Sequence, residues 1–172
     1  MALVQWDSEY SVGIPSIDLQ HREMFDMINE LYDAMRASNV AQVVPAILNR
    51  LEAHCREHFA CEEGMMLKAG YPGYLRHKAE HISLTEKAKA LARDFDEGKL
   101  VCSLAFLTLL KEWTQRHILS TDKKYSSHLQ SAGLGSTTEE SCHETWPDPL
   151  SPPTLSPTPA VFMGCSTVIL RR

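Results

Sequence analysis

Histidines and carboxylates recur on the apolar stripes of this chain, and no other feature restricts the fold as much. They fall at spacings that turn them inward on successive amphipathic helices: His21, His58, Glu62, His77, His81, His117 and Asp122. His58 and Glu62 are separated by four positions, and so are His77 and His81, so each pair projects from one face of its helix. A fold that buries these side chains together must provide partners for an unusually large number of buried polar groups.

The apolar periodicity predicts four helices. Met24, Phe25, Ile28 and Leu31 share a stripe with His21, which predicts a helix over about 18–37. A second helix is expected over about 41–68 and ends at Gly70 and Pro72. The third ends before Gly98, and the fourth covers about 102–127. Short connections favour an all-α, antiparallel up-down-up-down four-helix bundle, preceded by an N-terminal arm.

The composition divides the chain into two parts. Residues 1–128 form the expected bundle, and residues 129–172 form a Ser/Thr/Pro-rich tail that holds most of the prolines, between Pro147 and Pro159. Such a composition cannot bury enough apolar surface to offset its ordering entropy, so we expect a disordered tail. Its apolar end is too short to span a membrane. It is either a docking segment or a tail without function, and the second reading is the simpler one.

Charge and patterning exclude several classes of partner. The formal net charge is -5, and neither Lys nor Arg forms a run, which argues against binding to nucleic acid or to an anionic membrane. The N-terminus has no basic segment followed by an apolar one, and no window reaches the length of a membrane span. We therefore expect a cytoplasmic protein.

The set of polar residues points to a metal centre. A cation would remove the cost of burying imidazoles and carboxylates together. Mixed nitrogen and oxygen ligands suit iron, copper, manganese or zinc, and the absence of thiolates disfavours an iron-sulfur cluster. Two carboxylates that bridge, with imidazoles outside them, indicate two metals about 3.5 to 4 Å apart.

The motifs that carry these residues resemble a known family, the hemerythrins, and within it the single-domain bacterial members. The resemblance covers roughly residues 1–128. Its landmarks are Trp6, GIP at 13–15, DLQH at 18–21, HFACEE at 58–63, GYP at 70–72, HKAEH at 77–81, and WTQRHI at 113–118 followed by Asp122.

This resemblance implies a ligand set and an activity. One non-haem iron would take His77, His81 and His117, and the other His21 and His58. Glu62 and Asp122 would bridge both irons beside an oxo or hydroxo group. The second iron would keep an open position for reversible binding of dioxygen, which makes the chain an oxygen carrier or store and not an enzyme.

Two other functions stay open. One is an oxygen or redox sensor, which would normally be fused to an output domain, for which the tail is too short. The other is a di-iron enzyme with peroxidase-like or nitric-oxide-handling activity. No Glu-x-x-His pair of the ferritin-like type supplies this set, and the predominance of neutral imidazoles favours oxygen binding over oxidation chemistry. An oxygen-consuming enzyme is the expected recipient. Zinc or manganese occupancy is a weaker alternative.

Residues beside the set carry further expectations. His54, one turn before His58, is an additional ligand, a partner of a ligand or a residue at the core edge. Glu63 is expected on the solvated surface, because neighbouring helical positions diverge, and Trp113 is expected to pack around the site. Thr114 stands where the resembling family usually has leucine. It either enters the oxygen pocket or bonds back to its own helix.

The spacing in the last helix predicts a local irregularity. His117 and Asp122 are five positions apart, which on a regular α-helix places them about 140° apart around the axis. They cannot both face one metal pair in that geometry. We therefore predict a π-bulge or a local widening between them.

Overall fold

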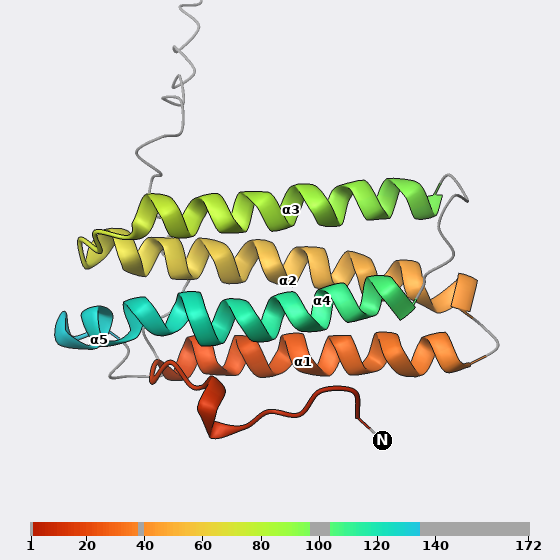
Figure 1. Ribbon diagram of the computed structural model, residues 1–172, viewed down its shortest axis with the longest axis horizontal. Coiled ribbons are helices and arrows are strands. Elements are labelled where there is room, and N and C mark those ends of the chain that lie inside the picture. Colours follow the sequence, from red (N-terminus) through yellow and green to blue (C-terminus); the bar gives the residue numbers. More distant parts are fainter. Residues whose placement is uncertain (1, 38–39, 97–103, 135–172) are drawn as a thin grey trace, which may run out of the picture.

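The computed structural model describes residues 2–37, 40–96 and 104–134, and within these ranges it is all-α. Four long helices lie side by side along the long axis of the molecule (Figure 1). The elements in chain order are η1 (Ser8–Tyr10), α1 (Pro15–Arg36), α2 (Val40–Lys68), α3 (Tyr74–Asp96), α4 (Leu104–His117), the π-helical turn η2 (Ile118–Asp122) and α5 (Lys123–Ser131). The predicted four-helix bundle is confirmed.

Short connections set the antiparallel order of the helices. The turn between α2 and α3 begins at Gly70, which adopts a positive φ of 63°. The amide of Tyr71 donates to the carbonyl of Met66, and that of Gly70 donates to the carbonyl of Leu67. This pair of bonds satisfies the last carbonyls of α2 and reverses the chain, as the sequence predicted for Gly70.

The N-terminal arm runs along α1 (Figure 1). Side chains of that helix hold it in place. Asn29 accepts hydrogen bonds from the amides of Leu3 and Val4 and donates one to the carbonyl of Val4. Asp18, in the first turn of α1, accepts a hydrogen bond from the amide of Val12 at 2.7 Å. These contacts hold the arm over the side of the bundle from which His21 enters the core.

Buried side chains form two apolar clusters on either side of a polar layer. One cluster includes Phe25, Leu51 and Leu110, and the other includes Ile17, Met66, Tyr125 and Leu129. Along α1 the buried His21 lies between Ile17 and Met24, and along α2 the buried His58 and Glu62 lie between Leu51 and Met66. Both clusters exclude water from the polar layer, so its charges interact in a medium of low effective dielectric constant.

The bundle ends slightly later than the sequence indicated. Helix α5 continues to Ser131, past the boundary expected after residue 128, and both Leu129 and Leu134 are buried. The physical reason is local, since Leu129 continues the apolar stripe of Tyr125 and packs into the second cluster. Residues 135–172, where the tail was expected, lie outside the described residues. In the part of the chain that is described, no helix is long and apolar enough to cross a membrane.

Candidate metal centre

A π-helix aligns His117 with Asp122. The turn Ile118–Asp122 is π-helical, and it closes with a hydrogen bond from the Lys123 amide to the Ile118 carbonyl. The wider turn compensates for the five-residue spacing, so both side chains face the core. Asp122 Oδ1 lies 3.1 Å from His117 Nε2. The predicted irregularity is confirmed, and it occurs at the polar layer, as π-bulges at functional sites often do.

All seven residues singled out from the sequence meet in the polar layer. Each is at most 4% exposed, and they come from α1, α2, α3, α4 and η2: His21, His58, Glu62, His77, His81, His117 and Asp122. Potential ligand atoms of Glu62, His77, His81 and His117 lie within 4.8 Å of one another, and so do those of His21, His58 and Glu62. The two groups share Glu62, which lies between them.

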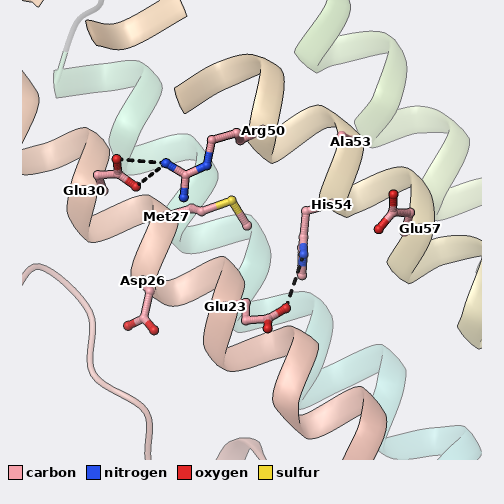
Figure 2. A pocket seen from close by; sticks show the side chains of 8 residues that line it. All are labelled: Glu23, Asp26, Met27, Glu30, Arg50, Ala53, His54 and Glu57. Carbon is pink, nitrogen blue, oxygen red and sulfur yellow. Dashed lines mark hydrogen bonds and ion pairs between the residues drawn. The ribbon is translucent and has the colours of Figure 1, made fainter. Parts of the chain in front are cut away.

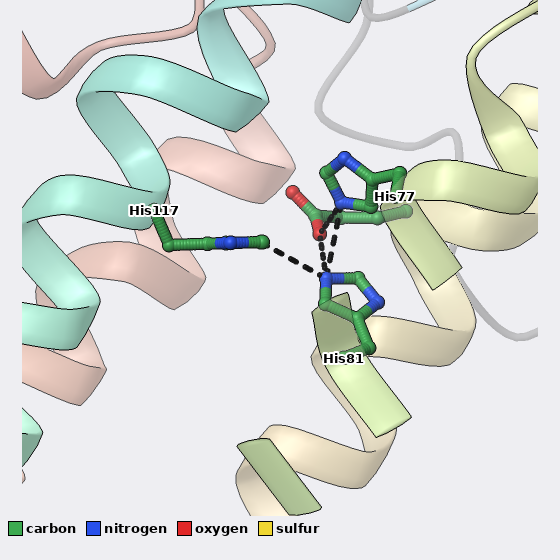
Figure 3. A group of neighbouring side chains, drawn as sticks. His77, His81 and His117 are labelled. Atoms are coloured by element: carbon green, nitrogen blue, oxygen red, sulfur yellow. Dashed lines mark hydrogen bonds and ion pairs between the residues drawn. The ribbon is translucent and has the colours of Figure 1, made fainter. Parts of the chain in front are cut away.

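The imidazoles of His77, His81 and His117 converge on one another (Figure 3), and Glu62 belongs to the same group of potential ligands. His81 Nε2 lies 3.0 Å from His77 Nε2 and 3.2 Å from His117 Nε2. The same atom lies 3.2 Å from Glu62 Oε2. Ring nitrogens gathered around a carboxylate oxygen at these distances form a set of donors suited to one transition-metal ion.

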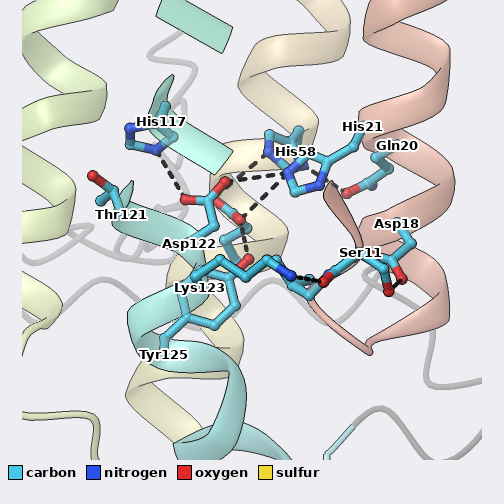
Figure 4. Close-up of polar contacts among 12 residues, drawn as sticks. Ser11, Asp18, Gln20, His21, His58, His117, Thr121, Asp122, Lys123 and Tyr125 are labelled. Atoms are coloured by element: carbon cyan, nitrogen blue, oxygen red, sulfur yellow. Dashed lines mark hydrogen bonds and ion pairs between the residues drawn. The ribbon is translucent and has the colours of Figure 1, made fainter. Parts of the chain in front are cut away.

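The second side of the site is built by His21 and His58 (Figure 4). His21 Nε2 lies 3.3 Å from Asp122 Oδ2, and His58 Nε2 lies 3.6 Å from Glu62 Oε2. Asp122 therefore directs one oxygen toward each histidine group. Its two oxygens and both ring nitrogens of His21 are buried without a hydrogen-bond partner among the described residues. Orphaned buried polar atoms of this kind fit the binding of cations, which would compensate their desolvation.

The electrostatics of the layer favour anionic carboxylates. Burial raises the pKa of Glu62, but His58, His77 and His81 outweigh it and hold that pKa well below its usual range. Burial and the nearby Glu62 raise the pKa of Asp122, but the imidazoles of His117 and His21 beside its oxygens outweigh them and bring it down to about 2. Burial lowers the pKa of His58 to about 3, so this imidazole is neutral and ready to bind a metal at neutral pH.

His81 differs from His58 in its protonation. Burial lowers the pKa of His81, but hydrogen bonds to Glu62 and Glu63 outweigh it and raise the pKa to about 9. Without a metal, a proton at His81 therefore compensates part of the negative charge. A metal that binds at Nε2 of His81, the nitrogen that faces the cluster, must displace the proton.

Hydrogen bonds behind the layer come from residues that the sequence did not assign to it. Glu63, expected on the solvated surface, instead lies 2.9 Å from His81 Nδ1 through its Oε1, and its side chain is only 16% exposed. Glu63 does diverge from Glu62 around α2, but this direction leads to α3 and not to solvent, and there Glu63 accepts a hydrogen bond from His81. The phenol of Tyr125 donates a hydrogen bond to Glu62 Oε1. A spacing of three from Asp122 is the only sequence signal for Tyr125.

Aromatic rings cover the histidines. The ring of Trp113 stacks on His117 with a centroid distance of 4.3 Å, and Phe59 stacks on His81 at 3.9 Å. The ring centroid of Trp6, in the N-terminal arm, lies 6.4 Å from that of His21. The prediction that Trp113 packs around the site is confirmed. These rings hold the imidazoles in place and keep bulk water away from them.

His54 lies outside the cluster, in a groove between α1 and α2 (Figure 2). The groove has a volume of about 500 Å³, and its lining includes Glu23, Glu30 and Arg50. His54 Nε2 donates a hydrogen bond to the Gln20 carbonyl, and its Nδ1 lies 3.5 Å from Glu23 Oε2. Both nitrogens are therefore engaged away from the cluster. Of the alternatives left open by the sequence, the structure favours a residue at the edge of the core.

The bundle and its buried layer of histidines and carboxylates define a class, that of four-helix proteins with a metal centre in the core. A family model described as "Hemerythrin HHE cation binding domain" matches residues 12–129. The chain belongs to the hemerythrin family.

Relatives and solved structures agree with this assignment. A bacteriohemerythrin of Methylococcus capsulatus is 32% identical over 75% of this chain and 98% of its own length. One of Stenotrophomonas maltophilia is 31% identical over 76% of this chain and 84% of its own length. The crystal structure of a wild-type hemerythrin superposes with a TM-score of 0.70 at 31% identity and covers 74% of this chain and 98% of its own.

Proposed function

We propose that this chain binds dioxygen reversibly at a non-haem di-iron centre, for transport, storage or delivery of oxygen. One iron would be held by His77, His81 and His117, and the other by His21 and His58. Glu62 and Asp122 would bridge the two. The observation that carries the proposal is the placement of these two carboxylates, each of which faces both histidine groups.

The unequal division of ligands supports binding at one metal only. A ferrous pair would supply two electrons and, on the side with fewer imidazoles, an open coordination position. The residues of the chain provide the ligands and exclude water from the site. Asp122 and Glu62, each of which faces both histidine groups, would hold both metals, and neutral His58 is available as a ligand at neutral pH. The apolar clusters and the rings over the site exclude water, which would otherwise promote loss of the bound oxygen in a reduced form.

The absorption spectrum tests the proposal. Iron-loaded protein should contain two irons per chain and show a charge-transfer band in air that disappears on deoxygenation and returns on readmission of oxygen. A protein whose spectrum does not change between these states does not bind oxygen reversibly. A chain that binds zinc or manganese but does not bind iron would show that the centre is not a di-iron centre.

One observation favours a second candidate, a di-iron enzyme. Thr114 lies on the inward face of α4, one turn before His117, and is 6% exposed. Among the described residues its hydroxyl makes no hydrogen bond, whereas the hydroxyls of Thr85 and Ser120 bond back to their own helices. A hydroxyl on a buried residue one turn from His117 could stabilise a reduced oxygen species or a water molecule. Consumption of peroxide or nitric oxide over many turnovers would support the enzyme.

A further inference from the structure

The outer nitrogens of two histidines in the three-histidine group face carboxylates. His81 directs Nε2 into the cluster, and its Nδ1 donates a hydrogen bond of 2.9 Å to Glu63. His117 also directs Nε2 into the cluster, and its Nδ1 lies 3.4 Å from Glu80 Oε2. Two negatively charged side chains therefore stand behind this group, outside the set of residues that would touch metal.

Both carboxylates are themselves held in place. Lys78 Nζ lies 3.2 Å from Glu63 Oε2, so Glu63 is fixed between Lys78 and His81. The hydroxyl of Thr121, in the π-helical turn, donates a hydrogen bond of 2.9 Å to Glu80 Oε2. Glu80 therefore connects α3 to the turn that positions Asp122. Neither carboxylate can swing away without breaking a second contact.

The two-histidine group has no such carboxylates among the described residues. His58 Nδ1 donates to the amide oxygen of Gln20 at 3.0 Å, which is a neutral acceptor. His21 has no hydrogen-bond partner for either ring nitrogen in the same part of the chain. The two sides of the site thus differ in the charge behind their imidazoles as well as in the number of imidazoles.

A carboxylate behind a metal-bound imidazole fixes the ring orientation and raises the basicity of the ligating nitrogen. We propose that Glu63 and Glu80 are positioning residues that make the three-histidine side the tight metal site, so that this side fills first and empties last. The two-histidine side, with Gln20 behind His58, is the labile site. This inference rests on the proposed di-metal centre and adds an order of occupancy to it.

The release of iron to a ferrous chelator, under anaerobic conditions, tests the asymmetry. Wild-type protein should lose its irons in two phases of equal amplitude. Glu63→Gln and Glu80→Gln keep the size and an acceptor oxygen but remove the charge, and each should accelerate the slow phase about tenfold to a hundredfold. Gln20→Ala should accelerate only the fast phase. Glu86→Gln is the matched control, because Glu86 lies on α3, is exposed and pairs with Lys89.

A second readout separates charge donation from simple packing. Loss of an anion behind His81 or His117 should raise the reduction potential of the iron bound there, because the ferric state loses more stabilisation than the ferrous state. Glu86→Gln should leave the potential unchanged. The inference would be overturned if Glu63→Gln and Glu80→Gln had the same release rates and reduction potentials as wild type. It would also be overturned if Glu86→Gln changed these quantities as much as Glu63→Gln and Glu80→Gln do. A wild-type chain that holds fewer than two irons would instead overturn the proposed centre, before any variant is compared.

Discussion

Asp122 places its Oδ1 3.1 Å from His117 Nε2, although the two residues are five positions apart in one continuous helical segment. The other oxygen of Asp122 lies 3.3 Å from His21 Nε2, on the far side of the layer. A single carboxylate thus spans both histidine groups, and the π-helical turn makes this reach possible.

Removal of either shared carboxylate should empty the whole centre. Glu62→Ala and Asp122→Ala should each lose both metals, because each carboxylate faces both histidine groups, whereas His21→Ala should mainly weaken one site. The measurement is the ratio of iron to protein after loading and desalting. Glu57→Ala, an exposed residue on α2, is the control and should retain both irons. Two irons in Glu62→Ala, or only one in wild type, would refute the ligand assignment.

Metal uptake should release a proton from His81. Its pKa of about 9 in the metal-free chain means that it is protonated at pH 7, and a protonated imidazole cannot bind a metal. The raised pKa therefore lowers the apparent affinity as pH falls below about 9, by about tenfold per pH unit for this one proton. Anaerobic titration with Fe²⁺ in weakly buffered solution would measure the protons released. Glu63→Gln keeps an acceptor oxygen but removes the negative charge that helps to raise this pKa, so the affinity of this variant for Fe²⁺ should become independent of pH from a lower pH than in wild type. An affinity for Fe²⁺ that does not change between pH 7 and 9 would contradict the prediction.

Tyr125→Phe should destabilise the metal-free bundle. Tyr125 is fully buried, and its phenol donates to Glu62 Oε1. Burial raises the pKa of Tyr125 well above its ordinary value, as does the nearby Glu62, so the phenol stays protonated and remains a hydrogen-bond donor at neutral pH. Loss of this donor leaves Glu62 Oε1 buried without its hydrogen bond from Tyr125, which should lower the free energy of unfolding by about 1–3 kcal/mol. Denaturant unfolding of the metal-free protein measures this cost. Tyr32→Phe, on a partly exposed ring of α1, should be neutral by comparison.

Thr114→Leu should slow oxidation of the iron centre in air without a change in iron content. A leucine in this buried position would exclude water from the open side of the proposed centre, whereas the hydroxyl of Thr114 can hold a water molecule. The decay of the oxygenated absorption band in the two proteins measures the effect. Thr108→Leu, at an exposed position fewer than two turns earlier on α4, serves as the control. Equal decay rates in wild type and Thr114→Leu would place the hydroxyl outside the oxygen pocket.

Truncation should distinguish the bundle from the segment that follows it. A chain that ends after Leu134 should keep its melting temperature, iron content and spectrum, because the tail composition predicts little buried surface. A chain that ends after His128 should lose stability, because it lacks the buried Leu129 and Leu134. A large loss in the longer of these two truncated chains would show that the apolar end of the full chain packs on the bundle.

The sequence alone determined the helices, the family and the need for a π-helical turn. Helical periodicity is a local property, so the stripes that carry His21, His58 and His77 could be read directly. The spacing of His117 and Asp122 is also local, and it required a wider turn if both were to face the core. The position of Gly70 at the end of α2 followed from its conformational freedom.

Only the tertiary structure decided what stands behind the histidines. Glu63 diverges from Glu62 around α2, as expected, but whether it meets water or His81 depends on the distance and rotation of α3. The contact between Tyr125 and Glu62 likewise requires α5 to continue past the π-helical turn and to pack against α2. Such contacts join residues far apart in the chain, and no local period encodes the packing offset between two helices.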